Sequence, residues 1–259
     1  MLASQMDADP AVYGWNQFRI GPWLRGERVK RSYSKFFDPK NRYSTWIKYQ
    51  LAKRFSSQQI SYEQKDQSIV GSKPFHVFNN PWIEESISID QFQNLRGHED
   101  AVRQGLMDMI RPEFRRLIDQ APAPALAIHV RRGDYSTNTV GRYVTPDSYF
   151  TDAIRSIRDS CNEDIPVTIF SDAWPAELEE ILAIPNVKLG AAQPDIVDLI
   201  QMSKSKFIVT SHGSTFGYWA GYLSKAAVIL NERHVTGRIR SESVPYFEGT
   251  IDQYCDLGD

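Results

Sequence analysis

The stretch from Ala125 to Tyr135, "ALAIHVRRGDY", decides the fold, because an apolar run of the buried type ends abruptly in charged residues. Further along the chain, the apolar runs "VTIFS", "VKLG", "KFIVTS" and "AAVILN" alternate with stretches whose apolar residues recur at helical spacing. Apolar strands that alternate with amphipathic helices are typical of a parallel sheet covered by helices on both faces. We therefore predict an α/β fold whose C-terminal part is a Rossmann-like parallel sheet.

The predicted elements follow from these patterns. Strands are expected near residues 126–130, 167–171, 187–190, 207–211 and 226–230, the last of which ends the sheet. Helices are expected within residues 145–160, 174–183, 194–205 and 213–224, with Thr145 as the cap and Pro146 as the first residue of the first of them. A helix or a pair of helices is expected between residues 98 and 118.

The residues before the sheet suggest a second region. The segment "APAPA" at 121–125 is a plausible hinge, so we predict an N-terminal region at 1–121 and a Rossmann-like domain at 122–259. Residues 18–55 are rich in Arg, Lys and aromatic side chains. They suit a solvated amphipathic surface, a patch for a membrane surface or lipid diphosphate, or a nucleic-acid surface.

Composition narrows the class of protein. A formal charge of −2 over 259 residues gives no general attraction to nucleic acid, so no nucleic-acid partner is expected. The two cysteines, Cys161 and Cys255, have no motif spacing, which argues against a disulfide framework. No apolar run reaches membrane-spanning length, and the first residues lack a signal pattern. A cytoplasmic protein, with peripheral membrane contact as an option, is the expectation.

Polar residues follow two of the expected strands, where ligands of parallel sheets bind. Residues 129–134 follow the first strand, and "SHGSTF" at 211–216 both follows a later strand and opens a helix. Backbone N–H groups of Gly213, Ser214 and Thr215 would face an anion at that helix start. An arginine opposite them supplies the forked donors that a diphosphate accepts, and Asp198 could accept from a purine.

Each feature also has a simpler interpretation. The paired arginines suit a salt-bridged strand end, and the Ser-Thr pair suits a helix cap. Arg132-Gly133-Asp134 suits an adhesion tripeptide if it lies on an exposed loop tip, and His129 suits a satisfied core histidine. The five histidines form no metal-binding pattern.

Taken together, the order of these blocks is more specific. "HVRRGDY" from His129 to Tyr135 is a complete H-x-R-R-x-D-Y motif, and "FSD" and the block from Asp198 to Trp219 follow it. This order resembles the α-1,2-fucosyltransferase family, with kinship to the α-1,6 enzymes. The resemblance implies a GT-B-like fold, with an abbreviated, mostly helical N-terminal part here. Residues 1–121 would then be the acceptor-side region, and residues 122–259 would be the GDP-sugar-binding domain. It also implies inversion at the sugar, GDP-fucose as the donor substrate, no cofactor and no metal.

The resemblance also implies roles for individual residues. Arg131 would be catalytic, holding the pyrophosphate and stabilising the charge of the leaving group. The donor-binding residues would be His129 and Asp198 on the guanine and ribose side, Ser214 and Thr215 at the phosphates, and Arg132. Arg132 would contact the donor or pair with a carboxylate. Asp134 and Asp172 would orient the arginines. The acceptor would be a glycan or lipid-linked oligosaccharide with a galactose-type hydroxyl.

One departure from the family keeps two functions open. The family normally opens with a glycine-rich G-G-L-G-N-Q-type loop after its first strand. The nearest segment here is "VYGWNQF" at 12–18, and no apolar strand precedes it. We predict a GDP-fucose-dependent enzyme like the galactoside α-1,2-fucosyltransferases. A degenerate, non-catalytic GDP-sugar-binding relative is the alternative, and an adhesion module is a third class.

Overall fold

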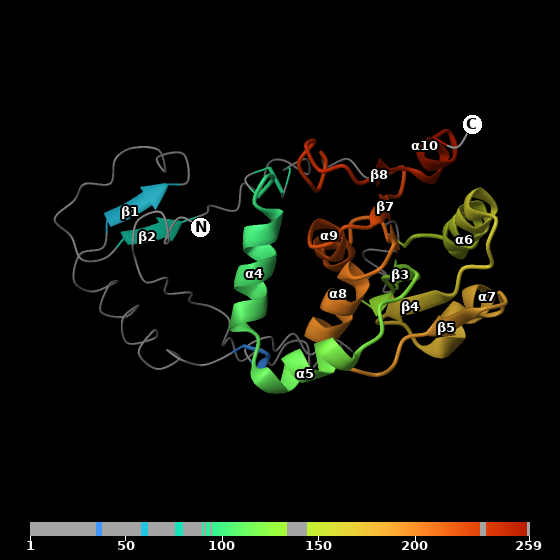
Figure 1. Cartoon of the computed structure of the whole chain (residues 1–259), viewed down its shortest axis with the longest axis horizontal. Coiled ribbons are helices and arrows are strands. Elements are labelled where there is room, and N and C mark those ends of the chain that lie inside the picture. The colour runs from blue at the N-terminus through green and yellow to red at the C-terminus, as the bar shows by residue number, and fades with distance from the viewer. Residues whose placement is uncertain are drawn as a thin grey trace. The chain divides into compact units, whose positions relative to one another are not determined.

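The computed structural model describes residues 35–37, 58–61, 76–79, 90, 92–93, 95–133, 144–233 and 237–257 (Figure 1). The chain forms two compact units, and each is described by itself. In the smaller unit, strand β1 (Gln58–Ser61) pairs in parallel with β2 (His76–Asn79). All described elements from residue 90 onward belong to the larger unit. The boundary between residues 121 and 122 stays a prediction, and most of the abbreviated N-terminal part lies outside the described residues.

A six-stranded parallel sheet forms the centre of the larger unit. Its order is β5-β4-β3-β6-β7-β8, and every neighbouring pair is parallel. The strands are β3 (Leu126–Val130), β4 (Val167–Ser171), β5 (Val187–Leu189), β6 (Phe207–Thr210), β7 (Ala227–Ile229) and β8 (Glu248–Gly249). This order confirms the predicted Rossmann-like sheet. The prediction that the sheet ends at the strand near residues 226–230 is wrong, because β8 lies beyond it.

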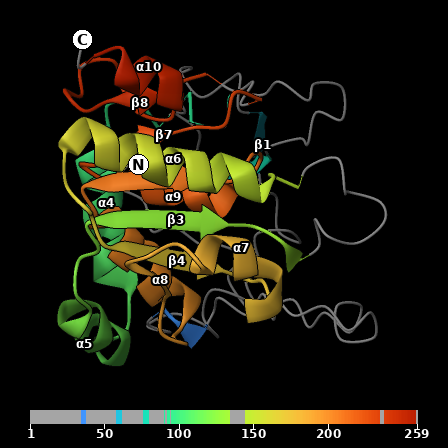
Figure 2. The ribbon, with the colours of Figure 1, turned by 90° about the vertical axis from the view of Figure 1, so that its right-hand side faces the viewer.

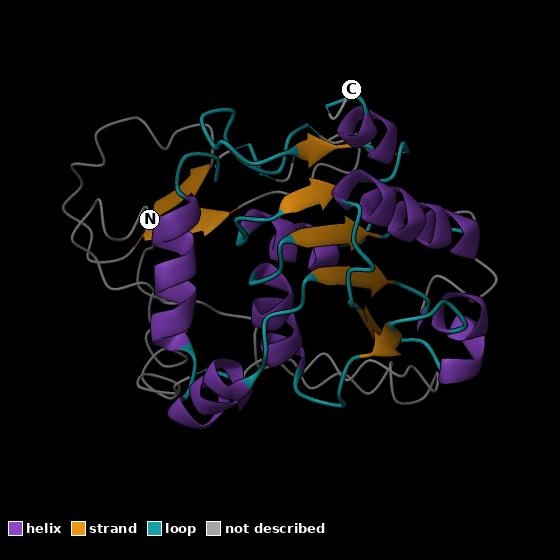
Figure 3. Cartoon of the chain, turned by 45° about the vertical axis from the view of Figure 1, so that its right-hand side comes forward, coloured by secondary structure: helices purple, strands orange, loops and turns teal. Residues whose placement is uncertain are grey.

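Helices cover both faces of the sheet, which confirms the layered α/β prediction. Helices α6 and α7 lie on one face, and α8 and α9 lie on the other (Figures 2 and 3). The helices of this unit are α4 (Glu99–Met109), α5 (Pro112–Gln120), α6 (Asp147–Cys161), α7 (Glu179–Leu182), α8 (Asp195–Ser203), α9 (Thr215–Tyr222) and α10 (Ile251–Cys255). A short 3-10 helix, η5 (Pro175–Leu178), precedes α7.

The central strand β3 is buried on both sides. One apolar cluster contains Leu126, Ile128 and Val130 together with residues of α6. A second apolar cluster contains Ala127 together with Met202 of α8 and a residue of α9. Successive side chains of a strand point to opposite faces, so one strand serves both clusters. An apolar run without polar alternation is the pattern that such a doubly covered strand requires.

The start of α6 differs from the prediction by one residue. Pro146 is the N-cap, and the helix begins at Asp147. The Thr145 hydroxyl does not cap this helix, because its Oγ1 accepts a hydrogen bond from the backbone N–H of His212 at 2.9 Å. Thr145 therefore connects the start of α6 to the loop after β6.

Among the described residues, no helix is both long enough and apolar enough to cross a lipid bilayer.

Candidate functional site

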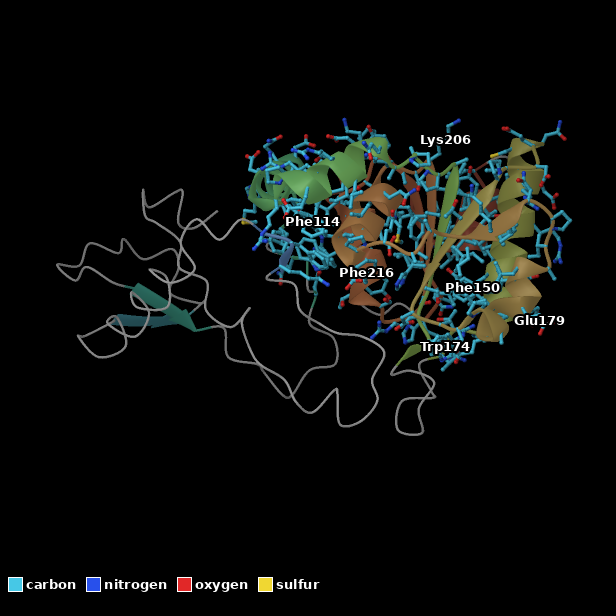
Figure 4. All side chains as sticks on the ribbon, turned by 90° about the horizontal axis from the view of Figure 1, so that it is seen from below. Phe114, Phe150, Trp174, Glu179, Lys206 and Phe216 are labelled. Carbon is cyan, nitrogen blue, oxygen red and sulfur yellow. The ribbon has the colours of Figure 1, made fainter. Side chains whose placement is uncertain are left out.

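The strand order reverses its direction between β3 and β6, at the carboxyl edge of the sheet. From β3 the chain continues to β4 and β5 on one side, and it returns to β6 on the other side of β3. The connections that follow β3 and β6 therefore leave in opposite directions, and ligands of open parallel sheets bind at such a point. In Figure 4, Lys206 before β6 and Trp174 after β4 mark the two opposite edges of the sheet.

Arg131 lies at this carboxyl edge and is paired with a carboxylate. Its NH1 atom is 2.6 Å from Oδ2 of Asp172, and the two side chains are only 16% and 15% exposed. The other carboxylate oxygen of Asp172 accepts a hydrogen bond from the backbone N–H of Arg132 at 2.8 Å. A charge-assisted bond of this kind fixes the guanidinium in direction as well as in place. These contacts are the ones that the predicted orienting role of Asp172 requires.

Gly133 leaves room for that pair. A Cβ atom at this position would clash with Oδ2 of Asp172, so a side chain here would displace the carboxylate. The glycine of the "RRGD" sequence therefore allows the Asp172 carboxylate to lie close to the backbone. The structure does not describe residues 134–143, so Asp134 and Tyr135 of the motif lie outside the described residues.

Arg132 is directed into the protein. Its NH1 atom donates to the backbone carbonyl of Thr145 at 2.9 Å, and its NH2 atom pairs with the Asp147 carboxylate. The side chain is buried, and its guanidinium lies over the ring of Phe150. Of the two alternatives for Arg132, the structure contains the carboxylate pairing, which ties β3 to the first turn of α6. A donor contact by Arg132 stays a prediction.

Ser211, which sequence analysis did not single out, connects the ends of β3 and β6. Its N–H and its hydroxyl both donate to the backbone carbonyl of His129, at 3.1 and 2.9 Å. Its Oγ atom also accepts from the backbone N–H of Arg131 at 2.8 Å. Ser211 is completely buried, so these bonds form away from water. The signal in the sequence was a small hydroxyl residue directly after an apolar strand.

The loop after β6 leads into α9 as predicted, but two of its three amide groups are used internally. The N–H of Gly213 donates to the hydroxyl of Tyr218 at 2.8 Å, and the N–H of Ser214 donates to the carbonyl of Ser211 at 3.3 Å. Gly213 has a φ of 66°, which favours glycine. An anion at this helix start would meet the first-turn amides from Thr215 onward, which lack acceptors within the helix.

Ser214 and Thr215 occupy the predicted positions at that helix start. Ser214 is the N-cap residue of α9, and its side chain is buried without making a capping hydrogen bond. Thr215 is the first helical residue and is exposed. The simpler interpretation of this pair was an ordinary side-chain cap. The hydroxyl of Ser214 does not make the hydrogen bond that such a cap requires.

His129 lies in β3, between Phe170 of β4 and Thr210 of β6. It is buried, its ring lies 5.2 Å from the ring of Phe216, and its Nδ1 atom has no hydrogen-bond partner. Burial, with a contribution from the nearby Arg131 charge, lowers the pKa of His129 to about 3. The imidazole is therefore neutral at physiological pH. It is not the satisfied core histidine of the simpler interpretation.

Asp198 is held in a separate polar network on α8. Its Oδ1 atom accepts from the side-chain amide of Gln193 at 2.7 Å, and Gln193 in turn donates to Gln201. Gln201 donates to the backbone carbonyl of Pro122 at 2.9 Å. Burial raises the pKa of Asp198 to about 7, and Asp195 nearby adds to the shift. None of these partners follows β3 or β6, so the guanine role of Asp198 stays a prediction.

Most of the basic-aromatic segment at 18–55 lies outside the described residues, apart from residues 35–37. The segment at 12–18, which is nearest to the expected glycine-rich loop, lies outside them as well. Within the part of the chain that the structure describes, no group of three or more His, Cys, Asp or Glu residues is arranged to hold a metal ion.

The sheet order and the helices on both faces define a Rossmann-like α/β domain, in which Arg131 follows β3 and the start of α9 follows the neighbouring strand β6. The model of the family described as "Glycosyl transferase family 11" matches residues 45–234 of the sequence. The chain belongs to glycosyl transferase family 11.

Two curated relatives come from Escherichia coli. The O-antigen biosynthesis glycosyltransferase WbnK is 31% identical over 108 residues, which are 39% of this chain and 35% of WbnK. The alpha-1,2-colitosyltransferase is 26% identical over 180 residues, which are 66% of this chain and 58% of that protein. The chain thus spans 35% and 58% of the lengths of these relatives.

Two solved structures resemble parts of the fold. NodZ alpha-1,6-fucosyltransferase soaked with GDP-fucose aligns with a TM-score of 0.38 and 16% identity, covering 54% of this chain and 51% of NodZ. The E. coli heptosyltransferase WaaC with ADP aligns with a TM-score of 0.36 and 13% identity, covering 56% of this chain and 48% of WaaC.

Proposed function

We propose that this chain is an inverting glycosyltransferase that moves L-fucose from GDP-fucose to a galactose-type hydroxyl of a glycan, with an α-1,2 linkage. The observation that carries the proposal is the Arg131–Asp172 pair at the carboxyl edge of the sheet, where the strand order reverses between β3 and β6. Membership of glycosyl transferase family 11 and the complete H-x-R-R-x-D-Y motif support it. The name of one curated relative, alpha-1,2-colitosyltransferase, contains the proposed linkage, and the other relative is named as an O-antigen biosynthesis glycosyltransferase.

The donor diphosphate would lie between Arg131 and the start of α9. The acceptor hydroxyl would attack the anomeric carbon from the side opposite GDP. A new C–O bond would form while the bond to the diphosphate breaks, and the hydroxyl proton would pass to a general base. GDP would leave with the electron pair of the broken bond, and inversion follows from that geometry. Negative charge would build up on the departing GDP, where the guanidinium and the first-turn amides of α9 stabilise it. Because these groups supply the positive charge, the proposal requires no metal ion.

His129 would contribute as a neutral group in this site. Burial disfavours a protonated imidazole, and the nearby positive charge of Arg131 disfavours it further, so the pKa of His129 is lowered. Its Nδ1 atom has no partner among the described residues, and the imidazole lies on β3, which ends directly before Arg131. We propose that it faces the guanine and ribose side of the donor.

The acceptor is proposed to be a glycan or a lipid-linked oligosaccharide. Residues 18–55 are the proposed surface for an anionic membrane or a lipid diphosphate, which would make the protein membrane-peripheral on the cytoplasmic side. Reversing the charges of Lys30, Arg31 and Lys35 together should then weaken sedimentation with anionic liposomes and leave the affinity for soluble GDP unchanged. Equal sedimentation of the reversed variant would remove the membrane proposal.

A degenerate, non-catalytic GDP-sugar-binding protein is the second candidate. It is favoured by the absence of the G-G-L-G-N-Q-type loop from the sequence. A transfer assay with GDP-fucose and galactose-terminated oligosaccharides separates the two, with the product examined by mass spectrometry and its linkage by NMR. A fucosylated product with an α-1,2 linkage supports the enzyme. Saturable GDP binding without transfer or donor hydrolysis supports the second candidate.

A further inference from the structure

Trp174 is an exposed aromatic residue beside the proposed donor site. Its side chain is 60% exposed, although it lies only three residues beyond the end of β4. It is located at the carboxyl edge of the sheet, as Figure 4 shows. Exposed apolar residues that stand alone are common on protein surfaces, so exposure by itself does not indicate a binding site.

The second observation is the backbone that carries Trp174. The backbone N–H of Trp174 donates to Oε2 of Glu177 at 2.7 Å, and its carbonyl accepts from the N–H of Glu177 at 2.9 Å. Pro175 follows at the first position of η5, and the N–H of Ala173 donates to the hydroxyl of Ser171 at 3.0 Å. The turn that presents the indole is therefore fixed before any ligand arrives, which lowers the entropic cost of binding.

The third observation is the position of this turn relative to Arg131. Asp172, two residues before Trp174, holds the Arg131 guanidinium at 2.6 Å. In sheets with this strand order, the diphosphate lies at the end of the first strand and the nucleoside extends toward the end of the second. Here those two strands are β3 and β4. A nucleoside whose diphosphate meets Arg131 would accordingly extend over the end of β4, where Trp174 lies.

We propose that Trp174 is a stacking platform for the guanine base of the donor nucleotide. This inference rests on the proposed function and adds a binding residue to its donor site. Stacking on an aromatic ring uses the flat face of a base and tolerates any base, so Trp174 supplies affinity and leaves the choice of base to polar groups.

The test compares GDP with inorganic pyrophosphate, which carries the same kind of anion without a base. Calorimetric titrations use the unmodified chain, Trp174→Ala, Trp174→Phe and the control Leu117→Ala. Leu117 is a suitable control because it is also an exposed apolar residue, 43% exposed, but lies on α5 before the amino end of β3. Quenching of tryptophan fluorescence by GDP is recorded in parallel for the unmodified chain and Trp174→Phe.

We expect Trp174→Ala to bind GDP about 5- to 100-fold more weakly, the range for loss of one base–aromatic stack. Its pyrophosphate affinity should stay unchanged, Trp174→Phe should recover most of the GDP affinity, and the GDP-dependent quenching should disappear in Trp174→Phe. Unchanged GDP affinity in Trp174→Ala would overturn the inference, and would fit an acceptor-side or purely surface role. An equal loss of affinity for GDP and for pyrophosphate in Trp174→Ala would also overturn the inference, since the residue would then act through Asp172. Absence of GDP binding in the unmodified chain would instead refute the proposed function itself.

Discussion

The replacement Arg131→Lys separates an anion site from a salt-bridged strand end. A lysine ammonium can still pair with Asp172, which lies 2.6 Å from the guanidinium, so the fold should survive the change. Lysine cannot reproduce the planar, forked donors that arginine presents to a diphosphate. Loss of one charge-assisted hydrogen bond costs about 1.5–3 kcal/mol. Because about 1.4 kcal/mol corresponds to a factor of ten, GDP binding should weaken about tenfold or more.

The assay is calorimetric titration with GDP, with folding checked by circular dichroism and thermal unfolding. The matched control is Arg155→Lys, because Arg155 also pairs with an aspartate, Asp152 at 2.9 Å, but is 69% exposed on α6. The control should bind GDP like the unmodified chain. If transfer is measurable, Arg131→Lys should reduce it more than it reduces binding, since the leaving diphosphate carries most charge in the transition state. Unchanged GDP affinity in a folded Arg131→Lys protein would refute the reasoning.

Three further predictions concern the surroundings of Arg131 and the network on α8. Asp172→Asn should weaken GDP binding roughly 3- to 10-fold, and should lower the free energy of unfolding in denaturant titrations by about 1–3 kcal/mol, because it removes the charge that holds the guanidinium. Gly133→Ala should weaken GDP binding and destabilise the fold by about 1–3 kcal/mol, since its Cβ would clash with the Asp172 carboxylate. Gly105→Ala in helix α4, with open space around its Cβ, should be neutral or stabilising by up to about 1 kcal/mol in the same unfolding experiment. Burial raises the pKa of Asp198 from 3.8 to about 7, so the folded chain binds more protons than the unfolded chain between these values. The free energy of unfolding should therefore fall as pH rises from about 4 to about 7 relative to Asp198→Asn, and urea titrations of both proteins at several pH values check this difference. Parallel pH profiles of the two proteins would contradict it.

The sheet could be predicted from sequence because burial on both faces leaves a strong local signal. β3 and β4 are apolar runs with charged residues at their carboxyl ends, and their bounds agree with the expected residues 126–130 and 167–171. β8 could not be found in this way, because it consists of only Glu248 and Gly249 and has no apolar run. Its feature is instead a buried ion pair, in which the fully buried Arg240 meets the carboxylate of Glu248 eight residues further along the chain.

The candidate site was predicted in part for a similar reason. Motif order identified Arg131 and the start of α9, since both are sequence features of strand ends. It could not decide between the two alternatives for Arg132, because its partner Asp147 is 15 residues away and meets it only after α6 folds back. The role of Ser211 also depends on tertiary structure, since it joins two strands whose residues are about 80 positions apart. The amide of Gly213 was expected to face the anion but donates to Tyr218.

The most direct test of the central proposal is a thermal-unfolding screen of the unmodified chain with GDP, GDP-fucose, GDP-mannose and UDP-sugars. A ligand that binds only the folded protein raises the unfolding temperature in proportion to the logarithm of its concentration above Kd. We predict that GDP and GDP-fucose raise this temperature, that the rise increases with concentration, and that UDP-sugars leave it unchanged. If no guanine nucleotide raises the unfolding temperature of the folded chain, the carboxyl edge of the sheet at β3 and β6 is not a GDP-sugar site and the proposed function is wrong.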